Sequence, residues 1–389
     1  MGRNRTRVRR TALAAVASVA LTLAACSTDS SNTTSSSGGG ADVSAAVKDN
    51  LTKYMAQPTF TAPGPAIDIS GVKGKSMFLI PLVPNPFNQS IQETMQRIAT
   101  QAGMKFTIYP NQGQASQWVQ GMNAALTAKP DIIVLSTAPD PRVLQPQLKA
   151  AKAAGIPVLV THFYDDSSPE PPDCEGCAAG VTALVTAPFN VAGKAAADWI
   201  IKDSGAKANT LVIGAGDILP SPATVQVVKQ EFADQCAGCK VTEINIPVAD
   251  WNTKVQGQVQ AALTKDPSIT YVYPLYDAMV SGAVPAVQTV GKKGKVKVVS
   301  YNGSPYVLKY IQDDNIAAMD VGEDTVGIGY ASMDQAFRIL LKKPTVPQRT
   351  PIRIWDASNV DETGTPPTVG KGYGNALPDG FSKLWGLSQ

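Results

Sequence analysis

Short apolar runs alternate with windows of helical period between residues 76 and 163, and this alternation limits the possible folds more than any other feature. The apolar runs read MFLIPLV, KFTIY, DIIVLS and IPVLVT, and the windows include IQETMQRIATQAG and VLQPQLKAAKAAG. Runs that are apolar throughout are typical of parallel strands buried on both faces of a sheet. Their alternation with helices predicts right-handed βαβ crossovers in an open, doubly wound α/β sheet.

Uncharged polar groups and aromatic side chains follow the predicted strands. In open parallel sheets, ligands bind outside the carboxyl ends of the strands, so the residues directly after each strand are the candidate site. These residues are Asn85, Phe87, Asn88, Asn111, Ser136, Thr137, His162 and Phe163. Because most of them are uncharged hydrogen-bonding groups or rings, the set predicts a neutral polar ligand.

The βα pattern begins again after residue 188. A helical window at 189–202 is followed by the apolar runs TLVIGAG, KVTEINIPV, ITYVYPLY and KVKVVSYN, with helical windows between them. The part of the chain from Ser76 onward is longer than one typical domain. Two successive βα sets therefore indicate two similarly built lobes.

Several stretches together resemble one protein family. The run PNPFNQSIQETMQRIATQAG, the run VLSTAPDPRVLQPQLKAAKAAGIPVLV and the later SYNGSP are similar to the sugar-binding proteins of bacterial ABC importers. The likeness is to the ribose-type branch of the type I periplasmic-binding fold. It implies two doubly wound parallel-sheet lobes joined by three hinge crossings, near Pro188, Gly322–Glu323 and Pro351.

The resemblance also implies a function. We expect a receptor that captures a small neutral sugar, sugar alcohol or cyclitol between its lobes and delivers it to ABC permease subunits. A receptor of the same fold that presents its ligand to a sensor kinase or chemoreceptor is the alternative, since both roles use the closed, liganded form.

The sequence divides into six predicted parts. An arm precedes the lobes: it begins with a short helical pattern, VSAAVKDNLTKYM, and continues through a proline-rich stretch, and we expect it to be extended and packed on the first lobe. A Gly- and Pro-rich tail follows the lobes along the surface. The parts are a signal peptide at 1–25, a lipidated flexible tether at 26–40, the arm at 41–75, an N-terminal lobe of 76–188 and 323–350, a C-terminal lobe of 189–322 and 351–360, and the tail at 361–389.

The first 25 residues indicate export. They carry five arginines and no acidic residue, and their apolar run, Thr11 to Ala25, is shorter than the roughly 18–20 residues that span a bilayer. The end of that run, Leu23-Ala24-Ala25-Cys26, resembles a bacterial lipobox, the alternative being ordinary secretory cleavage beside an incidental cysteine. We therefore expect an extracytoplasmic protein held at the cell membrane by a lipid on Cys26.

The charge balance excludes nucleic acid as a partner. The formal net charge of +3 becomes −2 once the five leader arginines are removed. The chain also lacks a basic patch with interleaved aromatics, which nucleic-acid binding would need.

Enzymatic chemistry and cofactors find no support in the motifs. His162 is the chain's single histidine, and no serine, cysteine or carboxylate motif accompanies it to form a catalytic triad. The VIGAGD stretch lacks both the third glycine of a dinucleotide loop and the Lys-Ser/Thr of a P-loop. Asp140-Pro141 is interpreted as a helix N-cap followed by proline at the first helical position, rather than as a ligand carboxylate.

The two CxxC pairs, CEGC and CAGC, are predicted to form two local disulfides, Cys174–Cys177 and Cys236–Cys239. A shared four-cysteine zinc site is the alternative, but 58 residues separate the pairs, well beyond common zinc-ribbon spacing. Neither pair opens a helix, as a redox-active pair would. Structural disulfides suit an exported protein.

The resemblance assigns ligand-binding residues one position at a time. Phe87, Trp251 and Tyr301 match stacking aromatics of the family, while His162 stands where relatives have an aspartate and Asn302 replaces the aspartate of the usual FDG pattern. The full set is Asn85, Phe87, Asn88, Thr137, His162, Trp251, Tyr276, Asp277, Tyr301, Asn302 and Glu323. Because several charged partners of the ribose-type site are replaced, ribose itself is disfavoured.

One prediction concerns the anchor. Acyl chains contribute about 0.8 kcal/mol per buried CH₂, and two or more chains hold a protein stably on a membrane. Cys26→Ser is therefore expected to release the protein from membranes or to block its processing, as cell fractionation and mass spectrometry would show. Normal processing and retention on membranes would contradict the lipobox interpretation.

Overall fold

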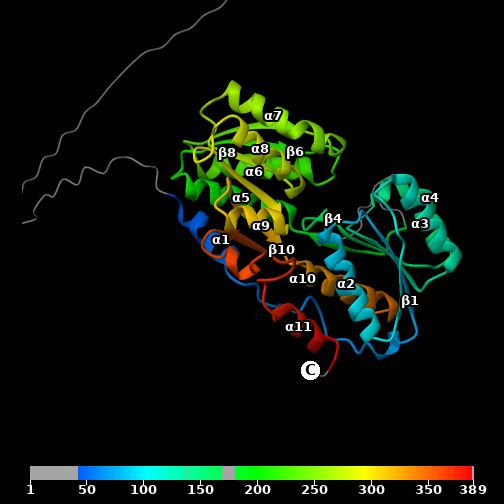
Figure 1. Ribbon diagram of the computed structural model, residues 1–389. Helices are drawn as coiled ribbons and strands as arrows, with labels where there is room; N and C mark the ends of the chain where they lie inside the picture. The colour runs from blue at the N-terminus through cyan, green and yellow to red at the C-terminus, as the bar shows by residue number, and fades with distance from the viewer. Residues whose placement is uncertain (1–42, 138, 169–179, 388–389) are drawn as a thin grey trace, which may run out of the picture. The chain divides into compact units, whose positions relative to one another are not determined.

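The computed structural model describes residues 43–137, 139–168 and 180–387. Two sheets organise them, and the first is five-stranded and parallel throughout, in the order β2-β1-β3-β4-β5. The predicted strands of the first lobe are confirmed (Figure 1). Their bounds are β1 Ser76–Pro81, β2 Lys105–Ile108, β3 Ile132–Ser136, β4 Val158–Asp165 and β5 Ala183–Ala187.

Apolar runs bury both faces of this sheet. On β3, Ile132 and Val134 belong to one hydrophobic cluster, whereas Ile133 and Leu135 belong to another. Helices α2 (Pro86–Gln101) and α10 (Thr325–Leu340) contribute to the first cluster, and α3 (Ala115–Ala128) and α4 (Gln145–Ala153) contribute to the second. The continuous apolar runs in the sequence follow from this double cover.

The second sheet has six strands in the order β11-β10-β9-β8-β6-β7. All neighbours are parallel except β11, which runs antiparallel to β10. The strands are β6 Asn209–Gly214, β7 Lys240–Asn245, β8 Tyr271–Pro274, β9 Lys297–Asn302, β10 Ala317–Glu323 and β11 Ile352–Asp356. The helices between them are α5 Phe189–Asp203, α6 Ser221–Gln235, α7 Trp251–Lys265, α8 Val280–Thr289 and α9 Pro305–Gln312.

The chain passes between the sheets at three points within 76–356. It leaves the first sheet after Ala187, returns after Glu323 into α10, and re-enters the second sheet at Ile352. Helix α10 packs against α2 and adds Ile328 and Phe337 to the core of the first sheet.

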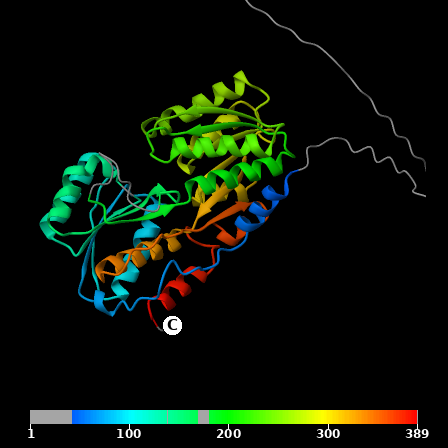
Figure 2. The same cartoon turned by 180° about the vertical axis from the view of Figure 1, so that it is seen from behind.

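The arm differs from the expectation in its first part. Helix α1 (Ala45–Met55) is capped by Ser44, whose side chain accepts from the Val47 amide. Its buried Val47 and Leu51 belong to the core of the second sheet, and α1 contacts α5 there (Figure 2). The chain reaches the first lobe only near Ile67, whose amide donates to the Leu384 carbonyl at 2.9 Å. The spacing of apolar residues predicted the helix but not which lobe would cover it.

The tail does more than cover the surface. Helix α11 (Ala376–Leu384) and Trp385 enter the core of the first lobe. The Trp385 indole donates to the buried Asp334 at 2.9 Å, and its ring stacks on Tyr330 at 5.6 Å. Trp385 and Trp355, for which the sequence indicated no role, are therefore core residues that are 2% and 0% exposed.

The structure contains the Cys236–Cys239 disulfide, directly after α6. Cys174, Cys177, Cys26 and the leader lie outside the described residues, so these predictions stay untested.

Asp140 accepts from the Arg142 amide at 2.8 Å, with Pro141 first in the short helix, which confirms the cap. Among the described residues, no helix is long and apolar enough to cross a membrane, and no cluster of three metal-ligating side chains occurs.

Candidate functional site

A hydrogen-bonded pair links the carboxyl ends of the two sheets. His162, on β4, places Nε2 at 2.9 Å and 2.8 Å from Oε1 and Oε2 of Glu323, the last residue of β10. The His162 side chain is 9% exposed and that of Glu323 is 0% exposed. Both residues were predicted from sequence as site residues, and the structure brings them together.

Aromatic rings surround this pair. The His162 ring lies 5.3 Å from the Phe87 ring and 5.2 Å from the Phe189 ring, both edge to face. Phe189 in turn meets the Tyr301 ring at 6.1 Å. Offset and edge-to-face ring contacts stabilise such clusters; Phe189 and Tyr301 are buried, at 5% and 3% exposed, and Phe87 is partly exposed.

Phe189 was missed by sequence reasoning. It is the first residue of α5 and follows β5 and Pro188 directly, at the first crossing between the sheets. The sequence signal that points to it is an aromatic residue just after a strand that leaves its sheet. The family likeness points to positions within the strand-end loops and gives this crossing only the role of a hinge.

Asn302 joins the same cluster. Its side-chain amide donates to Glu323 Oε1 at 3.3 Å. Asn302, His162 and Thr137 all have positive φ angles, at 138°, 55° and 52°. A residue with a side chain rarely adopts such a conformation, and a β-branched residue such as Thr137 does so at the greatest cost. Three predicted site residues thus occupy strained backbone at the strand ends.

Three polar residues of the first lobe have local partners. Asn85 caps α2 by accepting from the Asn88 amide at 2.8 Å, and the Asn88 side chain donates to the Val83 carbonyl at 2.7 Å. The Thr137 hydroxyl donates to the Ser136 carbonyl at 2.6 Å. The two asparagine bonds fix the loop that presents Phe87, and the Thr137 bond fixes the backbone directly after β3.

Trp251 and Tyr276 form a second ring pair in the other lobe. Their rings stack at 5.8 Å and 28°, and the Trp251 indole donates to the Ile246 carbonyl at 2.9 Å. Burial, and more weakly the charge of Glu323, raises the pKa of Tyr276 above its ordinary value. Of the two rings, Tyr276 is therefore the one whose ionisation responds to Glu323.

Asp277 is directed into the protein. It is 2% exposed, and its Oδ2 accepts from the Ser304 amide at 2.6 Å. Burial raises the pKa of Asp277 to about 6. The predicted site residue thus holds the turn after β9 rather than facing His162.

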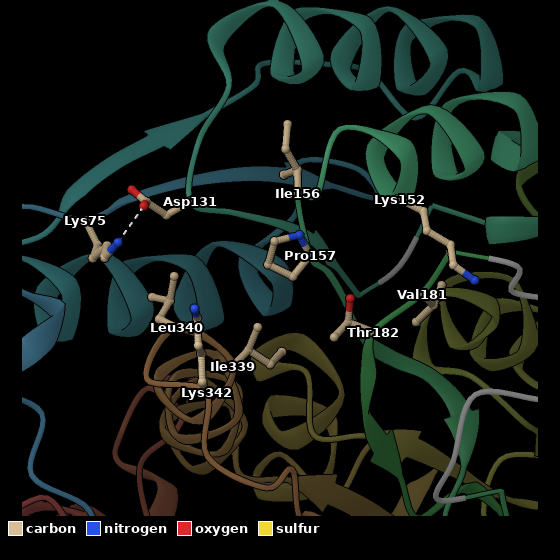
Figure 3. A pocket seen from close by; sticks show the side chains of 12 residues that line it. Lys75, Asp131, Lys152, Ile156, Pro157, Val181, Thr182, Ile339, Leu340 and Lys342 are labelled. Carbon is tan, nitrogen blue, oxygen red and sulfur yellow. Dashed lines mark hydrogen bonds and ion pairs between the residues drawn. The ribbon is translucent and has the colours of Figure 1, made fainter.

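A pocket of about 600 Å³ lies elsewhere on the first lobe (Figure 3). Lys75, Asp131, Pro157 and Thr182 line it, and each directly precedes a strand of the first sheet. Ligands of open parallel sheets bind at the opposite, carboxyl ends. No predicted site residue lines this pocket, so we do not place the site there.

Comparison with known proteins agrees with the fold. The family model for the periplasmic binding protein domain matches residues 76–344. Fructose import binding protein FruE of Bifidobacterium longum is 29% identical over 239 residues, which cover 59% of this chain and 69% of that protein. Ribose import binding protein RbsB of Salmonella typhimurium is 25% identical over 241 residues, covering 62% and 76%.

A solved structure shares the architecture. The solute-binding protein of an Agrobacterium vitis ABC transporter, with bound allitol, matches with a TM-score of 0.62 and 21% identity, covering 76% of this chain and 99% of that one. At this identity the likeness is one of fold, and it agrees with the two α/β lobes described above.

His162→Ala tests the linked pair. Removing the imidazole takes away both close contacts of the buried Glu323 carboxyl and leaves the longer bond from Asn302 at 3.3 Å, and an unsatisfied buried group costs about 1–3 kcal/mol. We expect urea unfolding to show that loss in the free energy of unfolding, and His162→Gln, which retains a donor, to recover part of it. Equal stability of the two variants would contradict the role of the pair.

Proposed function

The chain belongs to the periplasmic binding protein family, and from that premise we propose that it captures a small neutral sugar or polyol between its lobes and delivers it to an ABC permease. Members of this family are solute-binding proteins and not enzymes. The observation that carries the proposal is the His162–Glu323 pair, which joins the two sheets at their carboxyl ends among aromatic rings.

The chemistry of the cluster favours a neutral ligand with many hydroxyls. Rings such as Phe87 and Phe189 suit sugar C–H faces, while an imidazole, a carboxyl group and an amide together offer donors and acceptors to hydroxyls. The acidic Glu323 already has a partner in His162, so a charged ligand would have to displace it. The relatives support the same class, since they are fructose and ribose import proteins and a protein with bound allitol.

Ligand capture is proposed to close the lobes. His162 belongs to the first sheet and Glu323 to the second, so one ligand that contacts both interacts more strongly with the closed form. Only such differential contact shifts a conformational equilibrium. The hinge is proposed at the three crossings near Pro188, Gly322–Glu323 and Pro351.

The proposed site keeps the predicted residues and adds Phe189. Phe87, His162, Trp251, Tyr276, Tyr301, Asn302 and Glu323 are proposed to contact the ligand. Asn85, Asn88, Thr137 and Asp277 are proposed to act at the site mainly by holding its loops, because each is bonded to nearby backbone.

Delivery of a ligand to an ABC permease requires the protein to lie near the membrane that holds the permease. A periplasmic binding protein acts outside the cytoplasm, and we propose that a lipid on Cys26 keeps this one at the membrane beside its permease. The Ser/Thr/Gly-rich stretch after Cys26 has the composition of a flexible tether. A tether of this kind would let the lobes reach the permease while the anchor stays in the membrane.

A thermal-shift screen of pentoses, hexoses, sugar alcohols and cyclitols, followed by calorimetry on the hits, tests the proposal. Losing the Trp251 ring should weaken binding by about 0.5–1.5 kcal/mol beyond lost burial, and losing the Asn302 amide by about 1–3 kcal/mol. Trp251→Ala and Asn302→Ala are therefore expected to bind the hit more weakly while staying folded.

The matched controls are Tyr54→Ala on α1 and Asn123→Ala on α3, which should bind as the unchanged chain does. A hit that binds equally well to both site variants would show that the site is misplaced. Absence of any hit in the panel, together with binding of an amino acid or aromatic acid, would overturn the sugar assignment itself.

A further inference from the structure

The turn at 302–304, which carries Asn302 into the site, has a costly backbone conformation. Asn302 and Gly303 have consecutive positive φ angles of 138° and 77°. A Cβ atom on Gly303 would lie 2.8 Å from the Cα of Gly322, so only glycine fits there. Strained backbone of this kind persists only where surrounding interactions fix it.

Two buried carboxyl groups supply those interactions. Asp277 Oδ2 accepts from the Ser304 amide at 2.6 Å, and Asp320 Oδ2 accepts from the Gly303 amide at 3.1 Å. Two successive backbone N–H groups, those of Gly303 and Ser304, thus point at the pair, an arrangement that favours a bound negative charge.

The two carboxyl groups are buried beneath the same turn. Asp277 is 2% exposed and Asp320 is 0% exposed, and their Oδ2 atoms accept from successive backbone amides. Among the described residues, neither Oδ1 has a hydrogen-bond partner. Two negative charges buried this close together repel each other, so a proton on one carboxyl group of the pair is favoured.

We propose that Asp320, paired with Asp277, is a positioning residue that holds the 302–304 turn so that the Asn302 side chain meets the bound sugar. The proposal rests on the proposed function for the identity of the ligand. It assigns an effect on affinity to a residue that does not contact the ligand, because Asp320 is completely buried beneath the turn and its Oδ2 bonds the turn's backbone.

The pair also predicts how pH acts on the turn. Burial, and next the charge of Asp277, raises the pKa of Asp320 well above its ordinary value, while burial raises that of Asp277 to about 6. Three tyrosines face the pair: Tyr273 of β8, Tyr306 of α9 and Tyr373 of the tail. Among the described residues, neither aspartate forms a salt bridge.

Both pKa values are raised on folding, so the folded protein holds protons that the unfolded chain has released. The stability that the pair contributes is therefore fully present below about pH 4, the ordinary aspartate range. It decreases as pH rises through about 6 and beyond. At high pH a second negative charge on the pair loosens the turn.

Asp320→Ala and Asp320→Asn in the full chain test the proposal, with Asp49→Ala, an exposed aspartate of α1, as control. D-fructose, D-ribose and allitol are titrated by calorimetry, and the compound that binds the unchanged chain is carried forward. We expect Asp320→Ala to weaken its binding about 5- to 100-fold, as for a lost buried hydrogen bond. Asp320→Asn, which mimics the protonated acid, should bind within a few-fold of the unchanged chain.

Two further readouts separate positioning from general destabilisation. The backbone amides of Gly303 and Ser304 should exchange faster with solvent in Asp320→Ala than in Asp320→Asn. The loss of thermal stability between pH 5 and pH 9 should be smaller in Asp320→Asn than in the unchanged chain, because the second ionisation is removed. If Asp320→Ala does not fold, this pH comparison still tests whether Asp320 positions the turn.

The outcomes that overturn the proposal are distinct from failure of the proposed function. Unchanged binding and amide exchange in Asp320→Ala, or a pH dependence of stability identical in Asp320→Asn and the unchanged chain, would show that Asp320 does not position the turn. If no panel compound binds the unchanged chain, the sugar-binding function fails, while amide exchange and the pH comparison still test the carboxyl pair.

Discussion

The carboxyl group of Glu323 is completely buried where β10 ends and the chain leaves the second sheet for α10. A buried carboxylate is costly unless charge and hydrogen-bond partners surround it. Its partners here are His162 from the other sheet and Asn302 from the neighbouring strand. Because Glu323 and its two partners come from three strands and two sheets, the position of each strand end depends on the same carboxyl group, and so do the rings packed around it.

Around that centre, polar groups serve mainly to fix loops. In the first lobe, Asn85 and Asn88 hold the turn that presents Phe87, and in the second, Asp277 and Asp320 hold the turn that presents Asn302. A site whose loops are already ordered loses little entropy on binding, which favours affinity. The groups that remain near Glu323 are rings and hydrogen-bonding side chains, a combination suited to polyhydroxylated ligands.

Sequence reasoning predicted the local features well because periodicity and strand-end position are local properties. The unbroken apolar run of β3 predicts that both faces of the sheet are covered, because successive residues of a strand point to opposite faces. Long-range choices were not predictable in the same way. The apolar stripe of α1 is suited to either lobe, and Leu51 packs on the second; Trp385 is separated by 51 residues from the Asp334 that it binds. Asp277 was expected to face the ligand, but its carboxyl group accepts from the Ser304 amide, 27 residues along the chain, a contact that no motif indicated.

A sugar that contacts both sheets is expected to close the lobes. Spin labels on cysteines introduced as Asn123→Cys on α3 and Gln256→Cys on α7 would report the distance between the lobes by pulsed electron paramagnetic resonance. With a sugar or polyol that calorimetry shows to bind, we predict that the distance distribution narrows and shifts to shorter values, and that non-binding sugars leave it unchanged. An identical distribution with and without a bound sugar would contradict the account.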